Sequence, residues 1–269
     1  MKNRYLYKYF WKNALHNFLF WLVLFAVVVL FLYPFARQIN KLMELSQSSN
    51  SQMTARMLLD LLNFNLYFLG FFLAPPLGII AGRALVNKEG EVLLAHRISR
   101  RDFYLGSFLF YGLLLLSIWA VFVGLYLMVT YIFNQPFTTD LVFKLVISAF
   151  GILLPFLWVG FLAVTVRPVA AIMIYLIIFL AVPSVATVAL PEKASASTKA
   201  MTVAAKVVSM TVPQAKPFQM IASPFSKLDR SAANLTSVKL FSYGTLWSVF
   251  LLLSGFLIYR KKDMIDPHA

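Results

Sequence analysis

Long uncharged apolar runs alternate with short polar segments along the whole chain. Most of these runs approach or exceed the roughly 18–20 residues that a helix needs to cross the hydrocarbon core of a bilayer. The pattern predicts an all-α polytopic membrane protein, with one transmembrane domain over residues 1–269. Six spans are expected: Leu15–Phe35, Leu61–Ile80, Phe103–Phe133, Leu145–Val166, Val169–Leu190 and Phe241–Tyr259.

The first fourteen residues predict an interfacial helix. Arg4, Lys8 and Lys12 recur every four residues, which places them on one helical face, while aromatic residues occupy other faces. A basic face beside aromatic anchors is typical of a helix that lies at a membrane surface. An ordinary basic flank of the first span fits the same residues equally well.

Three further features concern turns, kinks and close packing. Arg167-Pro168 predicts a tight turn, so the fourth and fifth spans should form a hairpin. Pro75-Pro76 predicts a kink in the second span, because proline removes a backbone donor and collides with the preceding turn. Gly151 and Gly160 offer a weak signal for close approach of helices. Residues 191–240 are expected to form a long extracytoplasmic loop.

Composition supports the membrane class and narrows the partners. The chain is 61% hydrophobic and 13% charged, whereas a soluble domain has roughly 45–50% apolar and about 25% charged residues. The net charge is +14, and most basic residues lie in short flanks of apolar runs. Anionic lipid headgroups are therefore expected partners, and nucleic acid is not. The chain has no cysteine, so it forms neither disulfides nor thiolate metal sites.

The distribution of lysine and arginine predicts the orientation. Thirteen of these residues lie on the side that would hold both termini, against four on the other side and seven in residues 191–240. The thirteen are Lys2, Arg4, Lys8, Lys12, Arg83, Lys88, Arg97, Arg100, Arg101, Arg167, Arg260, Lys261 and Lys262, and the four are Arg37, Lys41, Arg56 and Lys144. The positive-inside rule then predicts that both termini are cytoplasmic. We expect an integral protein of a prokaryotic plasma (inner) membrane.

The sequence carries no recognised catalytic or cofactor motif. It has no phosphate-binding G-x-x-x-x-G-K-[ST] loop, no G-x-S-x-G and no H-E-x-x-H. Its three histidines, His16, His96 and His268, are far apart, so no metal site is predicted. The spans contain no Asp, Glu, Lys or Arg, which disfavours an ion-coupled transporter, since such transporters bind the coupling ion at an intramembrane ionisable group.

The polar segment 81–102 is too long for a simple connection between antiparallel helices, which needs roughly 2–8 residues. At its end, Ser99 and Asp102 fit a capping box, in which Ser99 accepts from the Asp102 amide and the carboxylate reaches back. Exposed arginines and aliphatic residues favour a protein-docking segment. The candidate docking residues are Glu89, Glu91, Leu93, Leu94, Ile98, Arg100 and Arg101. A charged loop held by lipid headgroups is the simpler alternative.

These residues resemble a known family. Lys88-Glu89-Gly90-Glu91-Val92-Leu93-Leu94, Ile98-Ser99-Arg100 and Phe103-Tyr104-Leu105-Gly106 are similar to the cytoplasmic loop of type-2 ATP-binding-cassette (ABC) transporter permeases. The six-span layout, the basic aromatic N-terminus and the closing Arg260-Lys261-Lys262-Asp263 are similar as well. Arg97 stands where the family often has proline, and Ser107 where it often has lysine.

The resemblance implies a non-enzymatic permease subunit of an ATP-driven exporter. It would pair with a second permease subunit as a homo- or heterodimer and contact a cytoplasmic P-loop ATPase through a coupling helix between spans two and three. ATP and Mg would then bind the ATPase, and no cofactor would bind this chain. A non-transporting membrane scaffold and a lipid-modifying membrane enzyme are the alternatives.

Overall fold

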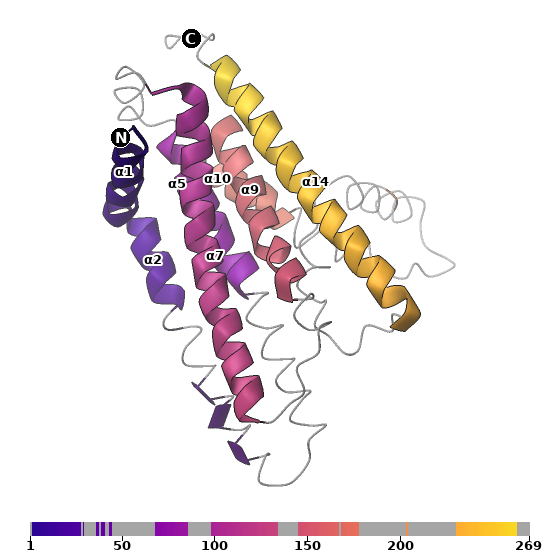
Figure 1. Ribbon diagram of the computed structural model, residues 1–269. Helices are drawn as coiled ribbons and strands as arrows, with labels where there is room; N and C mark the ends of the chain where they lie inside the picture. The colour runs from indigo at the N-terminus through magenta and orange to yellow at the C-terminus, as the bar shows by residue number, and fades with distance from the viewer. Residues whose placement is uncertain are drawn as a thin grey trace, which may run out of the picture.

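The computed structural model describes residues 2–27, 29, 36–37, 39–40, 43–44, 68–85, 98–133, 145–166, 168–177, 203 and 230–262. Within these ranges every regular element is a helix (Figure 1). The elements are α1 (Lys2–His16), α2 (Phe18–Val27), the π-helical turn η2 (Leu69–Leu73), α5 (Ala74–Ala84), α7 (Arg100–Ile132), α9 (Phe150–Thr165), α10 (Pro168–Leu176) and α14 (Arg230–Lys262). The predicted all-α class is confirmed for the described part of the chain.

Three of the described helical segments are long and apolar enough to cross a membrane: Arg100–Ile132, Leu145–Thr165 and Lys239–Lys261. They correspond to the third, fourth and sixth predicted spans. The other three predicted spans lie partly outside the described residues and are represented by α2, by η2 with α5, and by α10. The count of six spans therefore remains a prediction.

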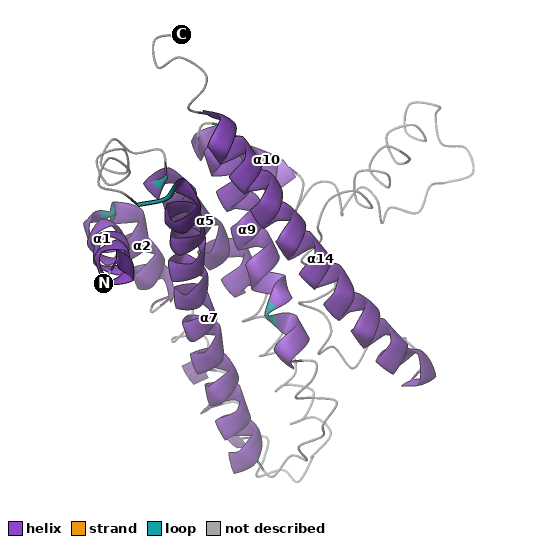
Figure 2. Cartoon of the chain, turned by 45° about the horizontal axis from the view of Figure 1, so that its top comes forward, coloured by secondary structure: helices purple, strands orange, loops and turns teal. Residues whose placement is uncertain are grey.

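The long helices pack around α9, which lies between α5 and α7 on one side and α14 on the other (Figures 1 and 2). The helix α5 runs parallel to α9, because Gly78 faces Phe156 and Gly82 faces Ala163. The helix α7 runs antiparallel to both of them. Its buried Ser107 hydroxyl donates to the Ala81 carbonyl oxygen over 2.9 Å and joins α7 to the last turns of α5.

The described parts of the predicted fourth and fifth spans, α9 and α10, pack against each other. The helix α9 ends at Thr165, and Val166 is extended, with φ −127° and ψ 173°. The next helix begins at Pro168, a position where proline is favoured because the first helical N–H has no partner within the helix. The helix α10 then returns along α9, and Tyr175 packs against Val159.

Small residues bring α5 and α9 into backbone contact. A Cβ atom added at Gly78 would lie 2.5 Å from the Phe156 carbonyl oxygen and 3.0 Å from the Gly160 nitrogen. A Cβ atom added at Gly82 would lie 2.8 Å from the Gly160 oxygen. Gly160 was predicted to allow close helix approach, whereas Gly78-x-x-x-Gly82, whose spacing is typical of closely packed membrane helices, was not.

The proline pair Pro75-Pro76 follows the π-helical turn η2. The Ala74 N–H donates to the Leu69 carbonyl oxygen, five residues earlier. The Gly70 carbonyl oxygen therefore does not accept the hydrogen bond that Ala74 would donate to it in an α-helix. The next donor in the π pattern would be residue 75, but proline has no N–H. The Tyr175 hydroxyl of α10 donates to the Gly70 carbonyl oxygen instead, over 3.2 Å.

Replacing Tyr175 with phenylalanine is expected to destabilise the folded chain by about 1–3 kcal/mol, because the buried Gly70 carbonyl would lose its partner. Thermal unfolding in detergent would show a lower melting temperature. Tyr131→Phe is the matched control, since this side chain is 73% exposed. Equal melting temperatures for the two variants would contradict the role given to the Tyr175 hydroxyl.

Three helix boundaries differ from the predicted segment limits. The helix α5 continues through Ala84, and α7 begins at Arg100, both inside the predicted segment 81–102. The helix α14 begins at Arg230, inside the predicted loop 191–240. Both α7 and α14 have 33 residues, a length of about 50 Å at 1.5 Å per residue. Both helices are longer than the roughly 30 Å thickness of the hydrocarbon core, so the length of the apolar run alone underestimates the length of each helix.

Candidate functional site at the start of helix α7

The start of α7 lies at the end of the bundle that also holds α1, the end of α5 and the end of α14 (Figure 1). The contacts agree with the picture. Phe103 stacks on Phe10 of α1, with ring centroids 5.5 Å apart. Tyr104 stacks on Tyr259 of α14, with ring centroids 5.8 Å apart. Successive residues of the first turn of α7 therefore contact two different neighbouring helices.

Ser99 caps this helix as the sequence predicts. Its backbone is extended, with φ −69° and ψ 143°, and its hydroxyl oxygen accepts from the Asp102 N–H at 3.0 Å. Its carbonyl oxygen accepts from the Phe103 N–H, also at 3.0 Å. The second half of the capping box is not formed: within the described residues, no hydrogen bond joins the Asp102 carboxylate to the Ser99 N–H. Asp102 is instead one of the residues that line a groove.

The predicted docking residues are only partly described. Ile98 is half-buried and packs against the main core, and Arg100 and Arg101 are exposed in the first turn of α7. The remaining candidates lie outside the described residues, and with them the coupling helix itself. They are Glu89, Glu91, Leu93 and Leu94.

The helix α1 rests on the first three turns of α7. Phe10 is completely buried, and its ring also approaches Phe110 and Tyr111, at centroid distances of 5.9 and 6.3 Å. The Tyr111 hydroxyl donates to the Phe10 carbonyl oxygen over 3.2 Å and accepts from the Asn13 side-chain amide over 3.3 Å. A Cβ atom at Gly106 would lie 3.3 Å from the Phe10 ring, so the glycine lets α1 approach closely.

The predicted basic face of α1 is present where its side chains are described. Lys8 and Lys12 are exposed, while Leu6, Phe10 and Ala14 are buried. The Arg4 side chain lies outside the description. Because the buried residues recur every four positions, α1 turns one apolar face to the bundle and the opposite, basic face outward. This arrangement is the amphipathic one that the sequence predicts for the N-terminus.

The contact between α7 and α14 is equally close. Tyr104 is completely buried among Phe108, Phe256 and Tyr259. Its hydroxyl lies directly against Gly255 of α14, so any side chain at that position would have to displace the ring. The absence of a Cβ at position 255 therefore lets α14 pack on the first turns of α7.

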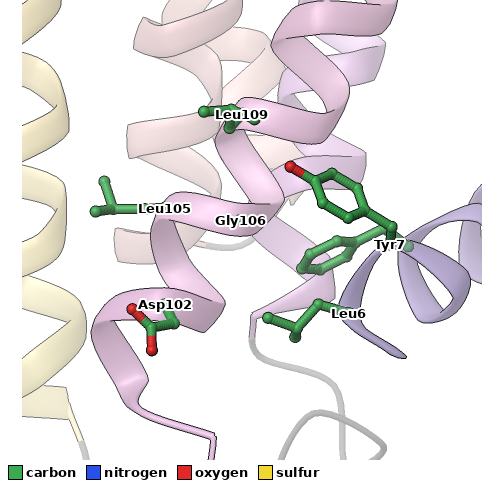
Figure 3. A pocket seen from close by; sticks show the side chains of 7 residues that line it. Leu6, Tyr7, Asp102, Leu105, Gly106 and Leu109 are labelled. Carbon is green, nitrogen blue, oxygen red and sulfur yellow. The ribbon is translucent and has the colours of Figure 1, made fainter. Parts of the chain in front are cut away.

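A groove of about 170 Å³ opens between α1 and α7. Figure 3 shows Leu6 and Tyr7 of α1 on one side and Asp102, Leu105 and Leu109 of α7 on the other. Phe10 and Gly106 complete its lining. Among the described lining residues, Asp102 supplies the one carboxylate, so the groove has an acidic end beside a largely apolar body.

Positive charge gathers around this end of the bundle. The exposed basic residues here come from four helices and are Lys8, Arg83, Arg100, Arg101, Arg260 and Lys261. Such a concentration favours an anionic surface, from lipid headgroups or from an acidic partner protein. Within the described residues, no group of three or more His, Asp or Glu side chains could hold a metal ion.

Comparisons with known proteins do not identify the chain: no protein-family model, curated protein or solved structure matches it. The functional inference therefore depends on the residues and their arrangement. Sequence reasoning missed Phe10, Tyr111 and Gly255 as part of this site. The spacing of Leu6, Phe10 and Ala14 was a visible signal for the buried face of α1, but no local pattern indicates which helix covers it.

Proposed function

We propose that this chain is the membrane-spanning permease subunit of an ATP-driven ABC exporter of the type-2 class. One observation carries the proposal: the capped start of α7 lies at the end of the polar segment 81–102 and contacts α1 through Phe10 and α14 through Gly255. A protein that moves the polar segment would displace the first turn of α7, and both neighbouring helices would be displaced with it.

Close packing makes this transmission physically reasonable. Packed helices with buried aromatic contacts and no space for added atoms move as units, because deforming such a contact costs free energy. Phe10 and Tyr104 are both completely buried, and the hydroxyl of Ser107 joins the same region to α5. Force applied at Ser99 would therefore reach α1, α5 and α14 without passing through a mobile loop.

The energy source would be a separate chain. The sequence has no phosphate-binding loop, and its predicted spans have no Asp, Glu, Lys or Arg that could couple transport to an ion gradient. We therefore propose a cytoplasmic P-loop ATPase, carrying ATP and Mg, as the partner at the polar segment. A second permease subunit would complete the pathway, and both termini would be cytoplasmic.

The first test is co-purification of this chain with a P-loop ATPase from the cells that naturally express it. Arg100→Glu with Arg101→Glu is expected to lower recovery of the ATPase at least about tenfold, since like-charge contacts at an interface cost several kcal/mol. Recovery would be quantified by mass spectrometry, and ATP hydrolysis by the complex would be measured in liposomes.

The matched control is Arg260→Glu with Lys261→Glu, which makes the same charge change at the same end of the bundle on α14. Recovery of the ATPase should stay near the wild-type level in this control. Equal losses in both double variants would show a general charge effect and contradict docking at α7. A recovered ATPase whose hydrolysis drives no transport would favour the scaffold alternative.

A further inference from the structure

The groove between α1 and α7 continues into an apolar stripe along α7. Leu105, Leu109 and Leu113 follow Asp102 at helical spacing and are 39%, 50% and 52% exposed. Figure 3 shows Leu105 and Leu109 on the same side of α7 as the Asp102 carboxylate. Since α7 is apolar enough to span a bilayer, this stripe leads from its polar start toward the hydrocarbon.

The polar end of the groove combines an acid with a base. Asp102 is exposed, and within the described residues its carboxylate makes no hydrogen bond or ion pair. Arg101 is also exposed and lies one helical turn before Leu105, next to the groove rather than among its lining residues. The acid of the groove and a neighbouring base thus lie on adjacent residues, beside an apolar surface.

We propose that this groove binds one aminophospholipid of the phosphatidylethanolamine type. Its primary ammonium would donate hydrogen bonds to the Asp102 carboxylate, its phosphate would face Arg101, and an acyl chain would lie along Leu105, Leu109 and Leu113. The arrangement matches the charges of a zwitterionic headgroup, with the ammonium and phosphate close together above an acyl chain.

The chemistry of Asp102 selects among lipids. An anionic headgroup such as that of phosphatidylglycerol has no ammonium group to pair with the carboxylate. The quaternary ammonium of phosphatidylcholine has no N–H and cannot donate a hydrogen bond. A primary ammonium forms charge-assisted hydrogen bonds, which are stronger than neutral ones. This inference goes beyond the proposed function, because the lipid site would exist whether or not an ATPase binds the neighbouring segment.

The test is native mass spectrometry of the purified full-length chain, delipidated in detergent and then offered equal amounts of phosphatidylethanolamine and phosphatidylcholine. Both lipids are net neutral, so their ratio isolates the ammonium contact. The wild-type chain should retain roughly five times as much phosphatidylethanolamine as phosphatidylcholine. Asp102→Asn should bring the ratio of the two retained lipids close to one. Glu44→Gln, which removes an exposed acid elsewhere, should leave the preference intact.

A second variant tests the apolar part of the site. Leu109→Trp fills the groove without changing its charge and should reduce retained phosphatidylethanolamine to the level of Asp102→Asn, with an unchanged melting temperature. A wild-type ratio near one, or a preference that survives Asp102→Asn in a folded chain, would overturn the proposal. If a second copy of the chain or another helix occupies the groove, neither variant should alter lipid retention. That result would also overturn the proposal.

Discussion

Replacing Gly78 with alanine is expected to destabilise the folded chain by ~3 kcal/mol and to lower its melting temperature by roughly 6–12 °C. The added Cβ would lie 2.5 Å from the Phe156 carbonyl oxygen. Backbone atoms cannot rotate away as a flexible side chain can, so α5 and α9 would have to separate. In a bilayer, this separation removes the van der Waals contacts on which helix association depends. Thermal unfolding in detergent or nanodiscs measures the effect.

Gly124→Ala is the matched control for this substitution. Gly124 lies in α7, and a Cβ atom there would meet nothing within 4 Å among the described residues. Alanine is also favoured over glycine inside a helix by roughly 1 kcal/mol. The control should therefore keep or raise the melting temperature. If Gly78→Ala behaves like Gly124→Ala, the close approach of α5 and α9 is not part of the folded state.

Replacing Phe10 with alanine is expected to release α1 from the bundle. The ring is completely buried against Phe103, Phe110 and Tyr111, and deleting a buried phenylalanine typically costs about 3–5 kcal/mol. The released helix would expose its backbone at Lys8 and Lys12 to trypsin. Cleavage at these two lysines should accelerate at least about tenfold, as measured by mass spectrometry of timed digests.

Phe18→Ala controls for the loss of an aromatic ring, because the Phe18 side chain at the start of α2 is 75% exposed. Its digestion should follow the wild-type time course. Rapid cleavage in both variants would show that any change near the N-terminus loosens α1. Unchanged cleavage in Phe10→Ala would mean that the aromatic contacts with α7 do not hold the helix in place.

Local features were predictable because neighbouring residues alone produce them. Ser99 caps α7 through a bond to a residue three positions away, and Pro168 begins α10 because its ring sets the backbone angle. The three long apolar helices were predictable for the same reason, since the length and polarity of a run suffice. The alternation of Lys8 and Lys12 with buried residues likewise follows from helical periodicity.

The features that depend on a partner were not predictable. Gly78-x-x-x-Gly82 can be read in the sequence, but its partner Gly160 is about eighty residues away in the chain. The Gly70 carbonyl required a donor that the local sequence does not supply, and Tyr175 of another helix provides it. The capping box was predicted whole, yet only its Ser99 half forms, which leaves the Asp102 carboxylate available to the groove.

The sequence by itself determined the helical class, the apolar segments, the capped start of α7 and the two faces of α1. These properties follow from the period of the helix, the dimensions of a bilayer and hydrogen bonds between near neighbours. Only the tertiary structure decided that the first turn of α7 lies between α1 and α14, and that a groove with one acid opens beside it. The physical reason is that packing depends on the shapes of surfaces distant in the chain, and no local pattern encodes their pairing.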